Sequence, residues 1–261
     1  MPELPDLEVY KDNVFARISS KRLVDVGVFN YQKVTAPQDF LRDELAGREL
    51  LGISRYGKEL YFDFGDGRVV TAHLMLNGVM SVIDHAAIST VKFKVFSLVF
   101  ENEALVFADR GGLCTIRYKP KKSGGPDAFD PKFTQEYFLK TARRKPMANI
   151  KAFLIDQSLI KGIGNAYADE ILWEARVSPR CLVGKLPEDA LCRLYSSIGA
   201  VLKNAIEQIK NISPDIISGE ERGFLNVHTK TKTQSPTGGQ IIVDRVASKI
   251  TYYTEEQIFY T

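Results

Sequence analysis

The first residues of the chain place an amine and a carboxylate where covalent chemistry could use them. The sequence begins Met1-Pro2-Glu3. Removal of Met1 would expose Pro2 as a secondary α-amine, which titrates well below a lysine side chain and is therefore partly unprotonated near neutral pH. Such an amine can attack the C1′ carbon of a sugar and form a Schiff base. Pro2 can equally be an ordinary residue at a flexible terminus, so this motif alone leaves both interpretations open.

A second stretch that could bind an anion is Gly162-Ile163-Gly164-Asn165. The apolar pattern of 150–157 predicts a helix before it, and Asn165 begins another helical pattern. Glycines between two helices let backbone N–H groups approach a phosphate closely, and the start of a helix favours the anion. The Asn165 amide can donate a further hydrogen bond. The same residues can also form a plain helix corner in which the glycines serve packing.

The elements that must position these residues fall into two groups. Apolar spacing predicts a helix over 5–19, and short alternating runs from about 22 to 118 predict an antiparallel sandwich or barrel. The Lys-, Gly- and Pro-rich stretch 119–131 is typical of an interdomain linker. Beyond it the pattern predicts helices followed by strands. We expect helices over 134–143, 147–157, 165–175 and 187–210, and strands over 224–228, 240–243 and 250–253.

The composition is typical of a folded protein with a hydrophobic core. Of its 261 residues 44% are hydrophobic, the mean hydropathy is −0.14 and the net charge is only +3. These values exclude a disordered protein, and we see no apolar run long enough for a membrane span and no signal peptide. Cys114, Cys181 and Cys192 are scattered, which predicts reduced core thiols rather than metal ligands or disulfides.

Several motifs occur together in an order and spacing that resemble one family. They are Met1–Glu8, Lys58 in RYGKEL, His73 in HLMLNG, and the Gly162–Glu170 segment. This combination is similar to the formamidopyrimidine-DNA glycosylase and endonuclease VIII family, and it spans nearly the whole chain. The resemblance implies an α+β fold with two domains: an N-terminal helix with an antiparallel β-sandwich, and a C-terminal helical domain with a helix-two-turn-helix and a β-hairpin finger. We expect domain boundaries at 1–118, 119–131, 132–223 and 224–261.

The resemblance also implies roles for individual residues. Pro2 would be the nucleophile and Glu3 the general acid that assists sugar-ring opening and proton transfer. Lys58 would contact phosphates beside the lesion and support catalysis, and Asn165 would hold the phosphates around an everted nucleotide. His73 would lie in a loop that faces DNA, although a lone His at a strand end is often a satisfied structural residue.

The C-terminal segment departs from the common family pattern. The usual module is a zinc finger with two CxxC pairs, and an ungapped alignment places Gln234, Thr237, Thr254 and Gln257 at the four cysteine positions. None of these residues supplies a thiolate. We therefore expect a zincless finger with no bound metal, in which Lys249 takes the place of the phosphate-binding arginine. Lysine keeps the charge but lacks the bidentate fork, so its grip on a phosphate is weaker.

Two further departures bear on specificity. The second carboxylate of the opening motif is Asp6 instead of glutamate, and it is a candidate for catalytic support. The residues that fill the space of an everted base are usually a large apolar side chain, an Arg and a Phe. Leu76 matches the first, whereas Gly111 and Leu113 take the other two places, with Arg110 close by. Wedge residues offset the cost of base flipping. Because only Leu76 matches the family pattern, the sequence does not determine which opposite base the protein would prefer.

The sequence thus predicts a DNA repair enzyme with glycosylase and abasic-site lyase activity. Its partner would be double-stranded DNA with an oxidised base or an abasic site. We expect no cofactor, no membrane association, a monomer, and a cytoplasmic location, or a nuclear one in a eukaryote. The short segment 213–223 favours oxidised pyrimidines, ring-opened purines or abasic sites over 8-oxoguanine paired with cytosine. The alternative is a catalytically impaired protein that binds damaged or structured DNA on the same scaffold.

Overall fold

The computed structural model of the chain describes residues 1–121 and 123–261. Lys122, which belongs to the predicted linker, lies outside the described residues. The chain divides into two compact units. The first contains Met1–Lys122 together with Ile209–Glu220, and the second contains Ser123–Gln208 together with Glu221–Thr261. The expected α+β class is confirmed, with a β-sandwich in the first unit and helices plus a C-terminal β-hairpin in the second.

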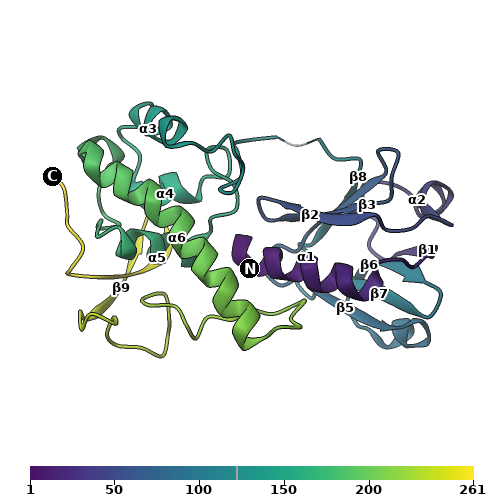
Figure 1. Cartoon of the computed structure of the whole chain (residues 1–261). Coiled ribbons are helices and arrows are strands. Elements are labelled where there is room, and N and C mark those ends of the chain that lie inside the picture. The colour runs from purple at the N-terminus through teal and green to yellow at the C-terminus, as the bar shows by residue number, and fades with distance from the viewer. Residues whose placement is uncertain (122) are drawn as a thin grey trace. The chain divides into compact units, whose positions relative to one another are not determined.

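The first unit is built on two four-stranded antiparallel sheets that form two layers (Figure 1). One sheet has the order β1-β6-β7-β5, with bounds Leu23–Val28, Lys94–Phe100, Glu103–Ala108 and Val79–Asp84. The other has the order β2-β3-β4-β8, with bounds Gly52–Tyr56, Glu59–Asp63, Val69–His73 and Thr115–Tyr118. Apolar and polar residues alternate along the strands, so each sheet has one apolar face. The apolar faces of the two sheets pack against each other.

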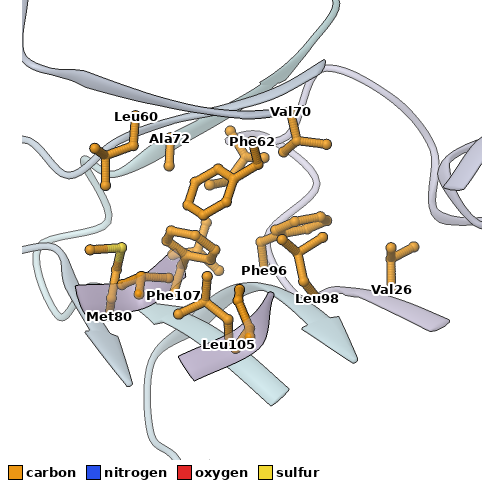
Figure 2. Close-up of a cluster of buried hydrophobic side chains, with 14 of the residues drawn as sticks. Val26, Leu60, Phe62, Val70, Ala72, Met80, Phe96, Leu98, Leu105 and Phe107 are labelled. Atoms are coloured by element: carbon orange, nitrogen blue, oxygen red, sulfur yellow. The ribbon is translucent and has the colours of Figure 1, made fainter. Parts of the chain in front are cut away.

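The core of this unit lies between the two sheets. Figure 2 shows side chains from both layers meeting there, with Phe62 of β3 directed toward Phe107 of β7. Their rings pack edge to face at 5.8 Å between centroids, and both side chains are fully buried. Phe96 of β6 lies 6.1 Å from Phe107. Burial of large aromatic side chains is a main stabilising contribution in a sandwich, so this cluster holds the two sheets together.

Helix α1, Leu4–Ile18, belongs to the same unit and begins directly after Pro2 and Glu3, the candidate catalytic residues. Its apolar side chains recur at helical spacing and are buried, as the sequence predicts. Arg55 of β2 forms an ion pair with Glu8 of α1, with 2.6 Å between Nε and Oε2. Helix α2, Gln38–Leu45, and the 3₁₀ helix η1, His85–Thr90, were not predicted, because each is too short to show a clear period.

The segment Ile209–Glu220 packs on α1. The Asn13 amide donates to the backbone carbonyls of Pro214 and Ile216 at 2.7 and 2.8 Å. Arg17 donates to the carbonyl of Asp215 at 2.7 Å, and Ile217 enters the sandwich core. In the sequence this segment adjoins the helix predicted over 187–210, most of which belongs to the second unit. The contacts with α1 and with the sandwich core make the segment part of the first unit.

The second unit holds the remaining helices and the hairpin. Their bounds are Gln135–Arg143 for α3, Ile150–Ile155 for α4, Asn165–Glu174 for α5, Val183–Lys185 for η2, Glu188–Ile212 for α6, Ile241–Val246 for β9 and Lys249–Thr254 for β10. Residues of α6 beyond Gln208 belong to the first unit. An aromatic cluster of Phe133, Phe138, Phe153 and Tyr195 packs among α3, α4 and α6.

Two predictions for this unit are wrong. The predicted helix over 147–157 is shorter, because the Asn149 side chain accepts from the N–H groups of Lys151 and Ala152 and so fixes the start of α4. The predicted strand over 224–228 is irregular. There the backbone N–H groups of Asn226, Val227 and His228 donate to the buried Glu170 carboxylate, each at 2.8 Å, and therefore cannot join a sheet.

In the described ranges 1–121 and 123–261, no helix combines the length and apolar character needed to cross a bilayer. All three cysteines are free thiols. Cys114 and Cys181 are buried, and burial together with Asp109 raises the pKa of Cys114 to about 12. Cys114 and Cys181 therefore agree with the predicted role as core thiols, whereas Cys192 is only partly buried.

Candidate functional site

The N-terminal residues are held by a reciprocal capping box at the start of α1. The Asp6 carboxylate accepts from the backbone N–H of Glu3 at 2.8 Å, and the Glu3 side chain accepts from the backbone N–H of Asp6. Such a box satisfies two helix N–H groups that otherwise lack partners. Pro2 and Glu3 are both buried, and Glu3 is 4% exposed. Asp6 therefore orients Glu3 through the backbone, next to Pro2.

An acidic residue that sequence reasoning missed also lies at the N-terminus. The α-amino group of Met1 forms an ion pair with Glu220, at the end of the segment Ile209–Glu220. The Tyr10 hydroxyl donates to the carbonyl of the neighbouring Gly219 and holds this part of the segment against α1. Because more than two hundred residues separate Met1 from Glu220, no local pattern could predict the pair.

Lys58 lies in the two-residue turn that joins β2 and β3. Tyr56 pairs with Glu59, and Gly57 has a φ of 62°, which a glycine adopts at little cost in a tight hairpin turn. Arg55 donates to the carbonyl of Gly57 at 2.9 Å while it pairs with Glu8 of α1. The same arginine thus links the Lys58 turn to the helix that Glu3 caps. Lys58 itself is 8% exposed.

A tight turn after β4 presents Leu76, whose side chain is 57% exposed. His73 Nδ1 accepts from the backbone N–H of Met75 at 3.0 Å, so this histidine supports the turn. Gly78 is required there, because a Cβ atom would lie 2.2 Å from the carbonyl oxygen of Leu74. The structure therefore gives His73 a structural contact and leaves the large apolar side chain of Leu76 projecting into solvent.

The loop after β7 is built around Asp109. Its Oδ1 accepts from the N–H of Gly111 at 2.7 Å, and its Oδ2 accepts from the N–H groups of Leu113 and Cys114 at 2.6 and 2.7 Å. A Cβ atom on Gly111 would lie 3.3 Å from the Asn77 amide, so this loop adjoins the Leu76 turn. Leu113 is 37% exposed and Arg110 is exposed. The predicted wedge residues thus lie on two neighbouring turns.

In the second unit α5 begins at Asn165, directly after the turn over 162–164. The Gln157 side chain holds this turn from both sides: it accepts from the N–H of Gly162 at 3.0 Å and donates to the carbonyl of Ile163 at 2.8 Å. The Asn165 amide donates to the carbonyl of Ile250 at 2.9 Å. Ile250 follows Lys249 in β10, so the two predicted phosphate-binding residues of this unit are neighbours. Lys249 is exposed at the hairpin tip.

A buried ionic network fastens β10 to the helices. Lys151 of α4 is fully buried, and its Nζ lies 2.7 Å from Asp169 Oδ1. The same ammonium donates to the carbonyl of Ile250 and to the Thr251 hydroxyl at 3.1 and 2.7 Å. Asp169 Oδ2 accepts from the Tyr252 N–H at 3.0 Å and lies 2.7 Å from His228 Nδ1. Buried charges require such full pairing, and here the pairing fixes the strand that bears Lys249.

Among the side chains that the structure describes, no group of three or more His, Cys, Asp or Glu residues is arranged to hold a metal ion. Gln234 and Thr237 are exposed before β9, whereas Thr254 and Gln257 are buried at the end of β10. These four positions, which the resemblance aligns with zinc-binding cysteines, carry only amides and hydroxyls.

Comparisons with known proteins agree with this architecture. Residues 1–116 match the family described as the formamidopyrimidine-DNA glycosylase N-terminal domain, and residues 125–215 match the formamidopyrimidine-DNA glycosylase H2TH domain. The formamidopyrimidine-DNA glycosylase of Lactococcus lactis subsp. cremoris is 30% identical over 268 residues, which covers 97% of both chains. The fold and site therefore define a helix-two-turn-helix DNA glycosylase scaffold. The chain belongs to the formamidopyrimidine-DNA glycosylase family.

Solved structures show the same likeness over the full length. Wild-type Lactococcus lactis Fpg in complex with DNA containing an oxidized pyrimidine has a TM-score of 0.86 and 28% identity, and the match covers 97% of this chain and 98% of that one. A complex of Lactococcus lactis Fpg with DNA containing an abasic site has a TM-score of 0.86 and 26% identity, with 97% of each chain covered.

Proposed function

We propose that this protein is a bifunctional DNA glycosylase and abasic-site lyase that acts through a Schiff base on Pro2. The observation that carries the proposal is the capping box, because it orients a buried carboxylate, Glu3, directly beside the residue that would supply the amine. Membership of the glycosylase family and the DNA-bound relatives support it. Removal of Met1 is required, since Pro2 otherwise carries an amide nitrogen.

The proposed chemistry balances without a cofactor. The Pro2 amine attacks C1′, the N-glycosidic bond breaks, and the base leaves with a proton. Glu3 donates a proton to the ring oxygen as the sugar opens, so that an iminium ion forms between Pro2 and C1′. A proton is then lost from C2′ to solvent as the C3′–O bond breaks, and a second proton is lost from C4′ to solvent as the C5′–O bond breaks, so that each phosphate leaves as an anion. Water finally hydrolyses the iminium ion and frees the Pro2 amine.

Phosphate contacts would position the damaged strand. Lys58 is a candidate beside the reacting sugar, and Asn165 and Lys249 are candidates in the second unit. Cations and amide donors of this kind supply affinity and register but read no base. Leu76 and Leu113 are exposed apolar side chains on adjoining turns and would fill the space of an everted base.

For the substrate we propose oxidised pyrimidines, ring-opened purines and abasic sites over 8-oxoguanine paired with cytosine. Two features support this preference. The segment Ile209–Glu220 is tied to α1 by Asn13 and Arg17, which leaves little free chain for a long recognition loop. Gly111 offers no side chain to read an opposite base. A panel of duplexes with each lesion opposite each base measures this preference directly.

Covalent trapping tests the nucleophile. On abasic DNA, borohydride should reduce the iminium ion and leave a stable adduct between protein and DNA. Pro2→Gly should weaken the adduct, and chemical blocking of the N-terminus should abolish it, because both changes act on the attacking amine. An adduct that persists after blocking would assign the nucleophile to a lysine, with Lys58 examined first.

A damage-binding protein without turnover is the second candidate. Asp6, Lys249 and Gly111, which depart from the common family pattern, favour it. Intact-mass measurement of the purified protein shows whether Met1 is present. This candidate requires no product on any lesion of the panel and higher affinity for damaged, bubble or single-stranded DNA than for undamaged duplex.

A further inference from the structure

The family resemblance implies a zinc ion at the base of the hairpin, but the residues of this chain do not fit one. Amide and hydroxyl oxygens replace the thiolate and imidazole groups that hold structural zinc. The side chains of Thr237, Thr254 and Gln257 are also engaged in hydrogen bonds within the protein. Gln257, for example, accepts from the N–H of Thr254 at 2.8 Å and donates to the carbonyl of Val177 at 2.8 Å.

A carboxylate occupies the centre of this region. Glu256 Oε2 accepts from the hydroxyls of Ser235 and Thr254, each at 3.0 Å. The Thr237 hydroxyl also donates to the Glu256 carboxylate and lies 3.0 Å from the Ser235 hydroxyl. Glu256 Oε1 lies 3.4 Å from Arg176, just beyond α5. We call the group of Arg176, Ser235, Thr237, Thr254 and Glu256 the carboxylate hub.

The backbone is shaped to accept this carboxylate. A Cβ atom on Gly239 would lie 2.3 Å from Glu256 Oε2 and 2.5 Å from its Cδ, so a side chain at this position would displace the Glu256 carboxylate. The Gly239 N–H donates to the Ser235 hydroxyl at 3.1 Å, and the Ser235 N–H donates to the Gly239 carbonyl at 2.8 Å. The turn before β9 is thereby folded around the carboxylate.

The hub connects three segments that are distant in sequence: the turn over 235–239, the end of β10, and the chain that follows α5. Hydrogen bonds from Thr237, Ser235 and Thr254, together with Arg176, lower the pKa of Glu256 to about 2, so the carboxylate is ionised at neutral pH. Hydrogen bonds to an ionised acceptor are shorter and stronger than neutral ones. Arg176 also stacks on Trp173, which packs in the small apolar cluster beneath the hairpin.

We propose that the carboxylate hub closes the hairpin in the place where related proteins would use a metal, so that the hairpin folds and presents Lys249 without zinc. The proposal that the hub closes the hairpin rests on the hydrogen bonds and the ion pair described above. Only its consequence for DNA affinity rests on the proposed function.

Hydrogen exchange on the full-length chain tests the hub. In Glu256→Gln the hydroxyl donors lose their charged acceptor, so the amides of β9 and β10 should exchange about tenfold faster or more. The matched control is Glu255→Gln, which removes the same charge from the exposed neighbouring residue and should leave exchange unchanged. If Glu256→Gln does not fold, Thr237→Val removes one donor and should accelerate exchange in the same peptides to a smaller degree.

Metal removal gives the second measurement. A chelator should change neither the exchange of β9 and β10 nor the affinity of the parent chain for abasic duplex. One zinc ion per purified chain whose removal speeds exchange would overturn the proposal, as would parent-like exchange in both Glu256→Gln and Thr237→Val. If Glu256→Gln exchanges faster but binds abasic duplex with unchanged affinity, the closure of the hairpin by the hub still holds. Only the proposed contact between the hairpin and DNA is then contradicted.

Discussion

At the scale of single residues, one carboxylate serves two purposes. Glu3 closes the capping box of α1 and is the proposed general acid. The two purposes are separable, because the side-chain amide of a glutamine still offers a carbonyl to the Asp6 N–H but has no acidic proton to donate. A substitution at this position therefore tests the chemistry without removing the cap.

We expect Glu3→Gln to bind abasic duplex with parent affinity and to cleave it roughly 10²–10⁴-fold more slowly, which is the usual contribution of general acid–base catalysis. Single-turnover cleavage together with equilibrium binding measures the two effects. Full turnover by Glu3→Gln on both abasic and base-lesion substrates would remove Glu3 from the mechanism.

At the scale of elements, one buried cation joins β10 to two helices. Lys151 neutralises Asp169 and donates to two groups of β10, so it joins α4, α5 and the hairpin. Loss of one partner from a buried ion pair leaves an uncompensated charge, which costs far more than loss of an exposed pair.

Lys151→Met should lower the free energy of unfolding by about 3–5 kcal/mol, since Asp169 would remain buried without its cation. Urea denaturation measures the change. Lys203→Met removes the same charge from an exposed face of α6 and should change stability by less than about 0.5 kcal/mol. Equal changes in the free energy of unfolding for the two substitutions would show that the buried pair stabilises the second unit no more than an exposed lysine does.

At the scale of the whole molecule, affinity for DNA should depend on separate phosphate contacts. Lys249 is exposed at the hairpin tip, and neighbouring Ile250 is bound by Asn165 and Lys151. The lysine is thus attached to a fixed strand with its charge free to meet a phosphate.

Lys249→Ala should weaken binding to damaged and undamaged duplex alike and reduce the salt slope of log K by about 1, because one fewer counterion is released. Titrations at several salt concentrations measure the slope, with Lys203→Ala as the control for general loss of charge. An unchanged slope would show that Lys249 does not contact a phosphate.

Local patterns in the sequence predicted most of the framework. Apolar spacing located α1 and most of α6, and alternation located β1, β3, β4, β6 and β7 of the sandwich, because burial of one face imposes those periods. The motif positions also predicted membership of the glycosylase family. The mechanistic roles of Pro2, Glu3 and Lys58 stay predictions.

Only the tertiary structure decided how distant residues meet. The segment 224–228 looked like a strand, but the Glu170 carboxylate takes three of its N–H groups. The sequence gives no sign of a role for Glu256, yet its carboxylate accepts from Thr254 and from two hydroxyls of the distant turn over 235–239. Side-chain acceptors that bind across long sequence separations leave no periodic trace in the sequence, so the closure of the hairpin could be found only in three dimensions.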